Sequence, residues 1–578
     1  MIKNDIEKAI AKALVELGAE EAHFVVERPA EMEHGDYATN AALAAAKILK
    51  KNPKEVAELL AARFVSRSPS TSEDGGVGVH VQQTSLPAIE RVEIAGAGFI
   101  NFFLTREAIV QEVEAAASKK EWGSNNLYKG KKVMVEYTDP NPFKEFHIGH
   151  LMSNTIGESI ARLLEVSGAK VLRANYQGDV GLHVAKAIWQ LQNADTPIVE
   201  LTDIGPSAAA YVDGSIEYEE NPIAREEINE INRKIYEKSD DSINRLYESG
   251  RKVSLEHFEE IYKILGTKFD KYFFESETWQ RGLELVKKNI NSVFEESEGA
   301  IIYRGEQDGL HTRVFINKTG LPTYEAKDLG LLELKKEAGA FDVSITITAS
   351  EQKEYFKVVL AAAKHIAEVQ DIAQKTTHIT HGMMRFAEGK MSSRTGNVIT
   401  GESLLADLTQ EAKIKMEDRK LSDTEKIAEQ IAVGAIKYTV LRQGSGKDII
   451  FDPAKSLSLE GDSGPYLQYA HTRALSLLKK TSVLELKLPS EKVLGGVSAL
   501  ERLLIHYPDV LAHAAEELEP HYVTTYLTEL AAAFNSWYAA ERVIGGEHER
   551  YGVLLAKAVE QTLAKGLQVL DIPAPEQM

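Results

Sequence analysis

Residues 131–176 constrain the fold more than any other part of the chain. Val133, Val135 and Tyr137 indicate a short apolar strand, and the helical stripe that follows ends near Gly168. A second strand pattern comes directly after that helix. A strand, a helix and a strand in this order form a βαβ unit, which builds a parallel, doubly wound sheet. Because ligands bind at the carboxyl ends of the strands in such sheets, we expect the functional site there.

The rest of the sequence is divided into segments around this unit. An amphipathic helix and strand patterns at the start indicate a small α+β domain, and the residues beyond about Thr400 are almost entirely helical. Val343, Ile345 and Ile347 alternate with polar residues, which predicts a further strand of the sheet after a charged helical stretch. We predict an N-terminal domain (1–118), a central α/β domain (119–400) with a helical insertion (about 196–298), a connecting helical stem (401–454) and a helical bundle (455–578).

Composition narrows the class of protein. The chain has no cysteine, which excludes disulfides, cysteine-bound zinc and thiol catalysis, so any metal must be held by oxygen or histidine. The 87 Asp+Glu against 67 Lys+Arg give a formal charge of −20, which excludes a simple basic protein that coats nucleic acid. The sequence shows neither a signal peptide nor an apolar run of about 20 residues, so we expect a cytoplasmic protein with no membrane contact.

The loop after the first predicted strand carries two histidines, His147 and His150, at the start of the predicted helix. The free N–H groups and the dipole at a helix N-terminus favour an anion such as a triphosphate. Gly149 leaves room for a flat ring, and imidazole donors suit nucleotide binding and a departing pyrophosphate. Two other interpretations are an incidental pair and a two-histidine metal site, but no third ligand is evident nearby.

A second polar segment favours the nucleotide interpretation. Residues 388–397 read Glu-Gly-Lys-Met-Ser-Ser-Arg-Thr-Gly-Asn, a cationic loop bounded by glycines. Such a loop is suited to close over phosphates and to move during a reaction cycle.

The two motifs together resemble the HIGH and KMSKS signatures of the class I aminoacyl-tRNA synthetases, and nearly the whole chain resembles the arginyl-tRNA synthetases. Several stretches carry this resemblance in the same order along the chain: 34–40, 97–101, 140–150, 173–179, 435–438, 464–469 and 575–578. The resemblance implies an α/β fold with a HIGH-type Rossmann-like parallel-sheet catalytic domain. It also implies an α+β N-terminal domain that contacts tRNA and an all-α C-terminal bundle that binds the anticodon.

The same resemblance implies a two-step reaction. The carboxylate of L-arginine attacks the α-phosphorus of ATP, which is bound with Mg²⁺, and a terminal ribose hydroxyl of tRNA(Arg) then accepts the arginyl group. We expect no structural zinc, a monomeric enzyme and a first step that requires tRNA. The residues expected to bind ATP and stabilise its transition state are His147, Gly149, His150, Lys390, Met391, Ser392 and Ser393.

The implied amino-acid pocket agrees with the chemistry of arginine. A guanidinium is planar, permanently charged and best recognised by carboxylates and other acceptors around its edge. By resemblance the pocket consists of Glu136, Asn141, Tyr324, Asp328 and Gln352. Asp328 is expected to pair with the guanidinium, and Glu136 or Asn141 to engage the α-amino end. Taken alone, Tyr324 also fits a core position and Asp328 a surface charge.

One departure from the family concerns the positive charge around the phosphates. The fourth residue of KMSKS is a lysine in the family, whereas here it is Ser393, followed by Arg394. This resembles the subgroup of arginyl enzymes that carry a lysine upstream of HIGH instead, which here is Lys144. We predict that Lys144 is catalytic and offsets the missing charge. Met152 and Val180 also differ from residues common in the family.

Three other functions stay open on the sequence. A class I synthetase for another amino acid is one, although the cysteinyl type usually needs cysteine-bound zinc and the glutamyl type needs a cationic pocket. A catalytically silent synthetase-like protein that binds tRNA is the second, and intact His147, Gly149, His150 and Lys390 argue against it. A small HIGH-containing nucleotidyltransferase is the third, but it leaves the C-terminal bundle unexplained.

The C-terminal bundle contains candidates for contacts with tRNA bases, because aromatic rings stack on unstacked bases. These candidates are Tyr466, Gln468, Tyr469, Trp537 and Tyr538. For Trp537, packing in the hydrophobic core is the stronger interpretation. Residues 455–578 carry eleven Lys+Arg and sixteen Asp+Glu, a balance of −5. Binding of tRNA must therefore use local basic patches and should be sensitive to salt.

Overall fold

The computed structural model of the chain describes residues 2–64, 86–194, 198, 200–386, 399–419, 422–481 and 496–578. The chain forms two compact units, each built from separate parts of the sequence. The first unit comprises Met1–Gly123, Ala470–Val510 and Tyr526–Lys565, and the second comprises Ser124–Tyr469, Leu511–Thr525 and Gly566–Met578. The segment predicted as one C-terminal bundle therefore contributes to both units.

A five-stranded parallel sheet organises the second unit, which confirms the α/β class. Its strand order is β12-β11-β5-β6-β7. The chain adds β6 and β7 on one side of β5, and β11 and β12 on the other, so the order reverses beside β5. In open parallel sheets, ligands bind at the carboxyl ends of the strands at such a reversal. The strands are β5 (Lys132–Glu136), β6 (Lys170–Gln177), β7 (Lys271–Phe274), β11 (Val343–Ala349) and β12 (Thr376–His381).

Helix α5 (Ile148–Val166) follows β5 and packs closely on the sheet, as the predicted apolar stripe requires. Gly157 permits this approach, because a Cβ there would lie only 2.2 Å from Cγ of Tyr137. The hydroxyl of Ser153 donates to the carbonyl oxygen of Ile347 at 3.1 Å and accepts from the backbone N–H of Thr138 at 2.9 Å. These contacts fix the start of α5 at the carboxyl ends of β5 and β11.

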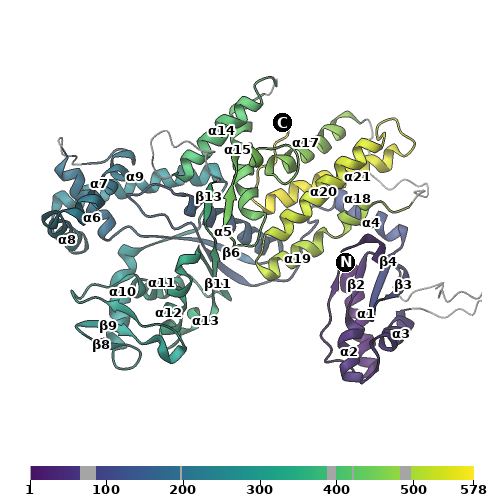
Figure 1. The fold of residues 1–578 in the computed structure, drawn as a ribbon, viewed down its shortest axis with the longest axis horizontal. Coiled ribbons are helices and arrows are strands. Elements are labelled where there is room, and N and C mark those ends of the chain that lie inside the picture. Colours follow the sequence, from purple (N-terminus) through teal and green to yellow (C-terminus); the bar gives the residue numbers. More distant parts are fainter. Residues whose placement is uncertain are drawn as a thin grey trace, which may run out of the picture. The chain divides into compact units, whose positions relative to one another are not determined.

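The helical insertion is shorter than the predicted range of about 196–298. Four helices follow β6, surround one apolar core and gather on the left of Figure 1. Residues 271–274, inside the predicted range, form β7 and pair with β6 in the main sheet. The sequence pattern missed β7 because its four residues are followed at once by a helix. The helices are α6 (Leu182–Asn193), α7 (Gly205–Glu220), α8 (Pro222–Glu237), α9 (Asp241–Leu265) and, after β7, α10 (Glu275–Lys288).

The chain between α10 and the stem completes the second unit. Helices α10 to α13 pack around a further apolar core, below the sheet in Figure 1. Strands β13 and β14 form a separate parallel pair. The elements are β8 (Glu295–Ser297), β9 (Ala300–Tyr303), η2 (Gly305–Asp308), β10 (Arg313–Ile316), α11 (Tyr324–Ala338), η3 (Ser350–Gln352), α12 (Lys353–Lys364), α13 (Gln370–Lys375), β13 (Met384–Phe386), α14 (Gly401–Lys415), α15 (Thr424–Leu441), β14 (Ile449–Phe451) and α16 (Pro453–Ser456).

The first unit contains a four-stranded antiparallel sheet of order β1-β2-β4-β3. Gly96 and Gly98 interrupt a strand-like sequence pattern, which predicts a turn between strands, and they form the turn between β3 and β4. The sequence pattern predicts one helical stretch from Asn40 to Val65, but the structure has two helices there, because Lys50 adopts a left-handed conformation between them. Residues 66–78 are rich in Ser, Gly and Pro, which predicts an exposed loop, and they lie outside the described residues. The elements are α1 (Ile2–Leu17), β1 (Val26–Glu27), η1 (Met32–His34), β2 (Tyr37–Thr39), α2 (Ala41–Leu49), α3 (Pro53–Phe64), β3 (Ile89–Ala95), β4 (Phe99–Leu104) and α4 (Arg106–Ser118).

The C-terminal part of the chain is helical, as predicted. Across the described residues, no helix combines the length and apolar character that crossing a membrane demands. The helices are α17 (Gly464–Lys480), α18 (Ala499–Ile505), α19 (Tyr507–Glu517), α20 (His521–Ala540) and α21 (Glu549–Val569).

Candidate active site

The loop that leaves β5 has a constrained backbone. Thr138 and Asp139 have φ angles of 81° and 49°, a region that residues with side chains rarely adopt. Hydrogen bonds from β6 and its following turn hold the loop there. The backbone N–H of Tyr176 donates to Oδ1 of Asp139 at 2.7 Å, and that of Gly178 donates to Oδ1 of Asn141 at 3.1 Å. Strain of this kind is concentrated at functional sites.

The two predicted histidines cap the start of α5 reciprocally. The backbone N–H of His147 donates to Nδ1 of His150 at 3.2 Å, and the N–H of His150 donates to Nδ1 of His147 at 3.3 Å. The rings stack with centroids 3.5 Å apart. Because each Nδ1 accepts a hydrogen bond, each neutral ring carries its hydrogen on Nε2 and can donate it to a ligand. Gly149 fits tightly, since a Cβ there would lie 2.9 Å from Cε1 of His147.

Both histidines are uncharged at neutral pH. Burial, followed by the charges of Lys144 and His381, lowers the pKa of His147 to about 4. Burial lowers the pKa of His150 well below its usual value, and coulombic repulsion from His147, Lys144 and His381 lowers it further. His381 ends β12, and its Nδ1 donates to the carbonyl oxygen of Gly382 at 2.8 Å. A third imidazole therefore lies near the predicted pair.

Two buried ion pairs stand at the carboxyl ends of the strands. Glu136, the last residue of β5, pairs with Nζ of Lys335 at 3.0 Å. Glu275, directly after β7, pairs with Nζ of Lys327 at 2.6 Å. Both lysines come from α11, so this helix supplies the positive charge that buried carboxylates need.

Asp139 and Asp328 add two further carboxylates. The hydroxyl of Tyr355 donates to Oδ2 of Asp328 at 2.6 Å. Burial, opposed by this hydrogen bond and reinforced by Glu136 and Glu275, raises the pKa of Asp328 to about 7. Burial and nearby Glu136 raise the pKa of Asp139 well above its usual range. Neither Asp forms an ion pair with another described residue, so a cationic ligand would stabilise both carboxylates.

The remaining pocket residues predicted from sequence lie at the same edge of the sheet. Tyr324 begins α11, one turn before Asp328, and its side chain is 61% exposed. It is therefore not a core residue. Gln352 lies in η3, directly after β11, and is exposed. Asp328 is half-buried and hydrogen-bonded, which distinguishes it from a surface charge.

The predicted phosphate loop, with Lys390, Met391, Ser392 and Ser393, lies outside the described residues. The chain resumes next to the histidines: Thr400 forms an isolated β-bridge with His147. The backbone N–H of Gly401 donates to the carbonyl oxygen of Phe146 at 2.8 Å. The residues that directly follow this loop are thus attached to the start of α5.

Lys144, the predicted source of compensating charge, lies between the constrained loop and the histidines. Its Nζ is 4.6 Å from the ring centroid of Tyr211 in α7. The helical insertion therefore contacts this lysine directly.

Several residues of the site escaped sequence reasoning. Asp139 directly precedes the 140–150 stretch, and nothing in its neighbours indicates a carboxylate with a raised pKa. Glu275 was missed together with β7, and no sequence pattern indicated its partner Lys327. Tyr355 lies 27 positions from its partner Asp328, and helix or strand periodicity does not predict contacts over such a separation.

Gln468 does not fit the predicted contact with a base. Its side chain is fully buried, and Nε2 donates to the carbonyl oxygens of Gln430 at 2.9 Å and Pro573 at 2.8 Å. Its amide thus joins segments of the second unit. Tyr466 and Tyr469, on the same helix, are half-buried.

Trp537 and Tyr538 lie in the first unit. Trp537 is half-buried and packs against an apolar cluster, in agreement with the core interpretation. Tyr538 stacks on Phe534, and the guanidinium carbon of Arg473 lies 4.6 Å from its ring centroid. An arginine beside a half-exposed ring is a combination found in sites for unpaired bases.

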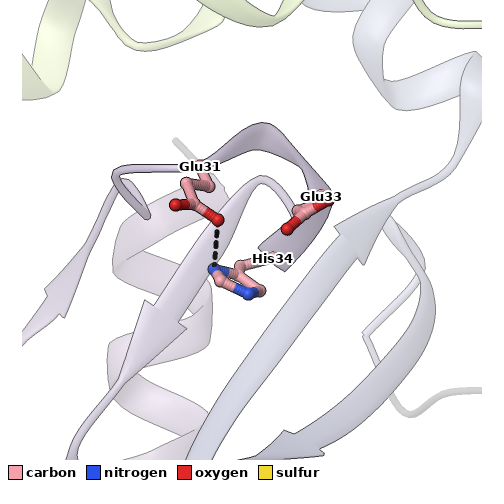
Figure 2. Close-up of side chains that lie close together, drawn as sticks. All are labelled: Glu31, Glu33 and His34. Carbon is pink, nitrogen blue, oxygen red and sulfur yellow. Dashed lines mark ion pairs between the residues drawn. The ribbon is translucent and has the colours of Figure 1, made fainter.

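A separate group of possible metal ligands lies in the first unit. Figure 2 shows Glu31, Glu33 and His34 around η1, with the ion pair of Glu31 and His34 at 4.0 Å. All three side chains are exposed. Exposed acidic groups gather without a metal in many proteins, and this group carries no functional assignment.

Comparisons with known proteins agree along the chain. The family described as "tRNA synthetases class I (R), catalytic domain" matches residues 112–453, "DALR anticodon binding domain" matches 467–578, and "Arginyl tRNA synthetase N terminal domain" matches 1–72. Arginine–tRNA ligase of Lactobacillus delbrueckii subsp. bulgaricus is 30% identical over 100% of both chains. That of Clostridium acetobutylicum is 28% identical over 99% of this chain and 100% of its own.

Solved structures give the same result. Arginyl-tRNA synthetase of Thermus thermophilus superposes with a TM-score of 0.80 and 26% identity over 100% of both chains. That of Plasmodium falciparum, at 20% identity, shares the fold with a TM-score of 0.79 over 100% of this chain and 99% of its own. The parallel sheet and its HIGH helix define a class I aminoacyl-tRNA synthetase. Within this class, the chain belongs to the arginyl-tRNA synthetase family.

Proposed function

We propose that this chain is an arginine–tRNA ligase in which Asp139 and Asp328 provide the negative charge that selects arginine. Two neighbouring carboxylates, Glu136 and Glu275, are already paired with lysines. Asp139 and Asp328 have no ion-pair partner among the described residues. Arginine brings two cationic groups, the guanidinium and the α-ammonium, and its charge complements the two carboxylates. This match of charge is the observation that carries the assignment of arginine.

The first step is attack of an arginine carboxylate oxygen on the α-phosphorus of ATP. A bond forms between these atoms, the bond to the bridging oxygen breaks, and pyrophosphate leaves. ATP enters with Mg²⁺ bound to its phosphates, and no structural zinc takes part. Nε2–H groups of His147 and His150 donate to phosphate oxygens as charge develops there, which lowers the barrier because the donors are already oriented.

Positive charge at the phosphates comes from Lys144 and from Lys390. Because Ser393 stands where a second loop lysine would be, Lys144 carries the larger share of the neutralisation. Neutral histidines suit this arrangement, since adjacent ammonium groups disfavour imidazolium. Gly149 lets the nucleoside approach the start of α5.

The second step transfers the arginyl group to a terminal ribose hydroxyl of tRNA(Arg), and AMP leaves. We propose that bound tRNA is needed even for the first step. Tyr538 with Arg473 is the best described candidate for a contact with a tRNA base. Because the chain carries a net charge of −20, tRNA must bind through local basic patches, and these contacts with phosphate should weaken steeply as salt is added.

A charging assay tests the whole proposal. Purified protein, ATP–Mg²⁺ and total tRNA are incubated with each amino acid in turn, and the esterified amino acid is measured. Arginine should be the substrate, and omission of tRNA should abolish arginine-dependent exchange of pyrophosphate into ATP. Charging of another amino acid overturns the specificity assignment, whereas binding of tRNA without any exchange activity indicates a catalytically silent protein.

We also propose that the enzyme acts as a monomer in the cytoplasm. Light scattering of the purified chain, at concentrations used in the charging assay, should give the mass of 63.9 kDa for a single chain. A mass twice this value overturns the monomer, and recovery of activity in a membrane or organelle fraction overturns the location.

A further inference from the structure

The residue before Lys144 is anchored in the helical insertion. Phe143 has a φ angle of 68° and a fully buried side chain, and it belongs to the apolar core that α6 to α9 surround. Its backbone N–H donates to the hydroxyl of Ser254 in α9 at 3.0 Å. The loop of the main sheet thus inserts one aromatic ring into a separate group of helices.

Helix α9 is shaped to receive this ring. A Cβ on Gly250 would lie 2.2 Å from Cε1 of Phe143 and 3.0 Å from Cδ1 of Leu201. Only glycine leaves this space open, because a real Cβ never approaches an atom so closely. Since a left-handed backbone at a bulky residue is costly, the insertion must supply the contacts that maintain it at Phe143.

The same insertion holds the side chain of the next residue. Nζ of Lys144 lies 4.6 Å from the ring centroid of Tyr211 in α7, and Tyr211 packs against the core that receives Phe143. A lysine ammonium over an aromatic face is attracted by the ring quadrupole. Helices of the insertion therefore fix both the backbone conformation at Phe143 and the position of the Lys144 side chain.

We propose that Tyr211 is a positioning residue for the first reaction step: its ring holds the ammonium of Lys144 where it can approach the phosphates of ATP. This inference rests on the proposed function, because it takes Lys144 as the compensating cation. A flexible lysine loses rotamer entropy when it binds phosphate, and a ring that restricts it beforehand reduces that loss. The insertion thus contributes to catalysis without touching the substrate.

A double-mutant cycle tests this role. Initial rates of arginine-dependent exchange of pyrophosphate into ATP are measured with tRNA present, at saturating arginine and varied ATP. Tyr211→Leu should lower kcat/KM for ATP by about threefold to thirtyfold, the range that a cation–π contact supports. KM for arginine, measured separately at saturating ATP with varied arginine, should stay unchanged. In the Lys144→Ala background, Tyr211→Leu should cause no further loss.

The chain offers matched controls. Tyr211→Phe keeps the ring face and should retain wild-type kinetics. Tyr218 lies two turns further along α7 and holds Nζ of Lys186 at 4.5 Å, so Tyr218→Leu removes a similar contact elsewhere and should leave kcat/KM for ATP unchanged. If Tyr211→Leu does not fold, phenylalanines of increasing fluorination at position 211 should lower kcat/KM stepwise, because fluorine weakens the negative face of the ring.

Three results would overturn the inference. The first is an equal loss from Tyr211→Leu in the wild-type and Lys144→Ala backgrounds, and the second is a Tyr211→Phe variant as impaired as Tyr211→Leu. The third is a folded Tyr211→Leu enzyme with wild-type kcat/KM. Failure of the proposed function looks different: Lys144→Ala then leaves exchange intact, or the wild-type protein charges an amino acid other than arginine.

Discussion

Tyr355 donates its hydroxyl hydrogen to Oδ2 of Asp328 across 2.6 Å, from a residue 27 positions further along the chain. The contact joins α12 to α11 beside the carboxyl ends of the strands. Burial raises the pKa of Asp328 to about 7, because it disfavours the ionised carboxylate. The hydrogen bond from Tyr355 favours the ionised form and limits this rise.

Removal of that hydroxyl should impair arginine use at neutral pH. In Tyr355→Phe, the pKa of Asp328 should rise by about one unit or more, since hydrogen bonds to charged groups are worth about 1.5–3 kcal/mol. At pH 7, kcat/KM for arginine should fall by about tenfold, with recovery toward pH 9. Steady-state kinetics across pH measures this, and a pH profile that coincides with wild type contradicts it.

Ionisation of Asp328 should also couple arginine binding to proton release. The folded-state pKa of about 7 exceeds the ordinary aspartate value of 3.8. Between these values the folded chain binds a proton that the unfolded chain does not, so this group's contribution to stability decreases as pH rises through that window. Binding of cationic arginine should lower the pKa of Asp328 again. Binding should therefore release up to about one proton near pH 6.5. Calorimetry in two buffers of different ionisation enthalpy measures the release; identical heats in both buffers count against the linkage.

The capping geometry of the histidines predicts different effects for two substitutions of His150. Asparagine places an acceptor near the position of Nδ1 but has no donor near Nε2, so His150→Asn should keep the helix cap and lower the rate of adenylate formation by about a hundredfold. Glutamine places a donor near Nε2 and loses the cap. His150→Gln should retain more activity and lose about 1 kcal/mol of stability.

Single-turnover adenylate formation and thermal melting distinguish the two variants of His150. Because the pKa of His147 is lowered to about 4 and that of His150 lies well below its usual value, neither ring should titrate between pH 5.5 and 8. Equal activities of the two variants, or an NMR titration of either imidazole ring with a pKa near 6.5, would contradict the assignment of Nε2–H as the donor.

Replacement of Gly149 by alanine should leave folding intact but impair activity. Alanine favours a helix by about 1 kcal/mol over glycine, so Gly149→Ala should not lower the melting temperature. Its Cβ, however, would stand 2.9 Å from Cε1 of His147 and displace that ring. Exchange of pyrophosphate into ATP should fall by at least about tenfold. A stable variant with wild-type exchange would show that the position of His147 does not matter.

The sequence predicted those parts of the site that are local in the chain. The periodicity of contiguous residues predicts helix α5 and the strands on either side, and the two histidines lie at the start of that helix as expected. Glu275 was missed because β7 has four residues, too few for a period to show. Asp139 was missed because its environment is formed by residues distant in the sequence, such as Tyr176 in β6 and Asp328 and Lys335 in α11. Gln468 was misjudged because composition cannot distinguish an exposed amide from one that binds two backbone carbonyls.

A buried charge network behind the site gives the last prediction. Nζ of Lys437 in α15 donates to the carbonyl oxygen of Leu265 and to Oδ2 of Asp571, and Asp571 also pairs with Arg162 of α5 at 2.6 Å. Burial lowers the pKa of Lys437 and raises that of Asp571. The network thus connects the helix of the two histidines with the C-terminal segment of the second unit.

Substitution of Lys437 and substitution of Asp571 should lower the stability of the fold by different amounts. Lys437→Met leaves Asp571 paired with Arg162, whereas Asp571→Asn leaves a buried ammonium with neutral acceptors and no counter-charge, so the second change should destabilise more. Asparagine tolerates the φ angle of 54° at position 571, which confines the effect to charge. We expect Asp571→Asn to cost about 3–5 kcal/mol and the double variant with Lys437→Met to cost less than Asp571→Asn alone. Differential scanning calorimetry of the first unfolding transition measures the order, and a double variant less stable than Asp571→Asn contradicts the argument.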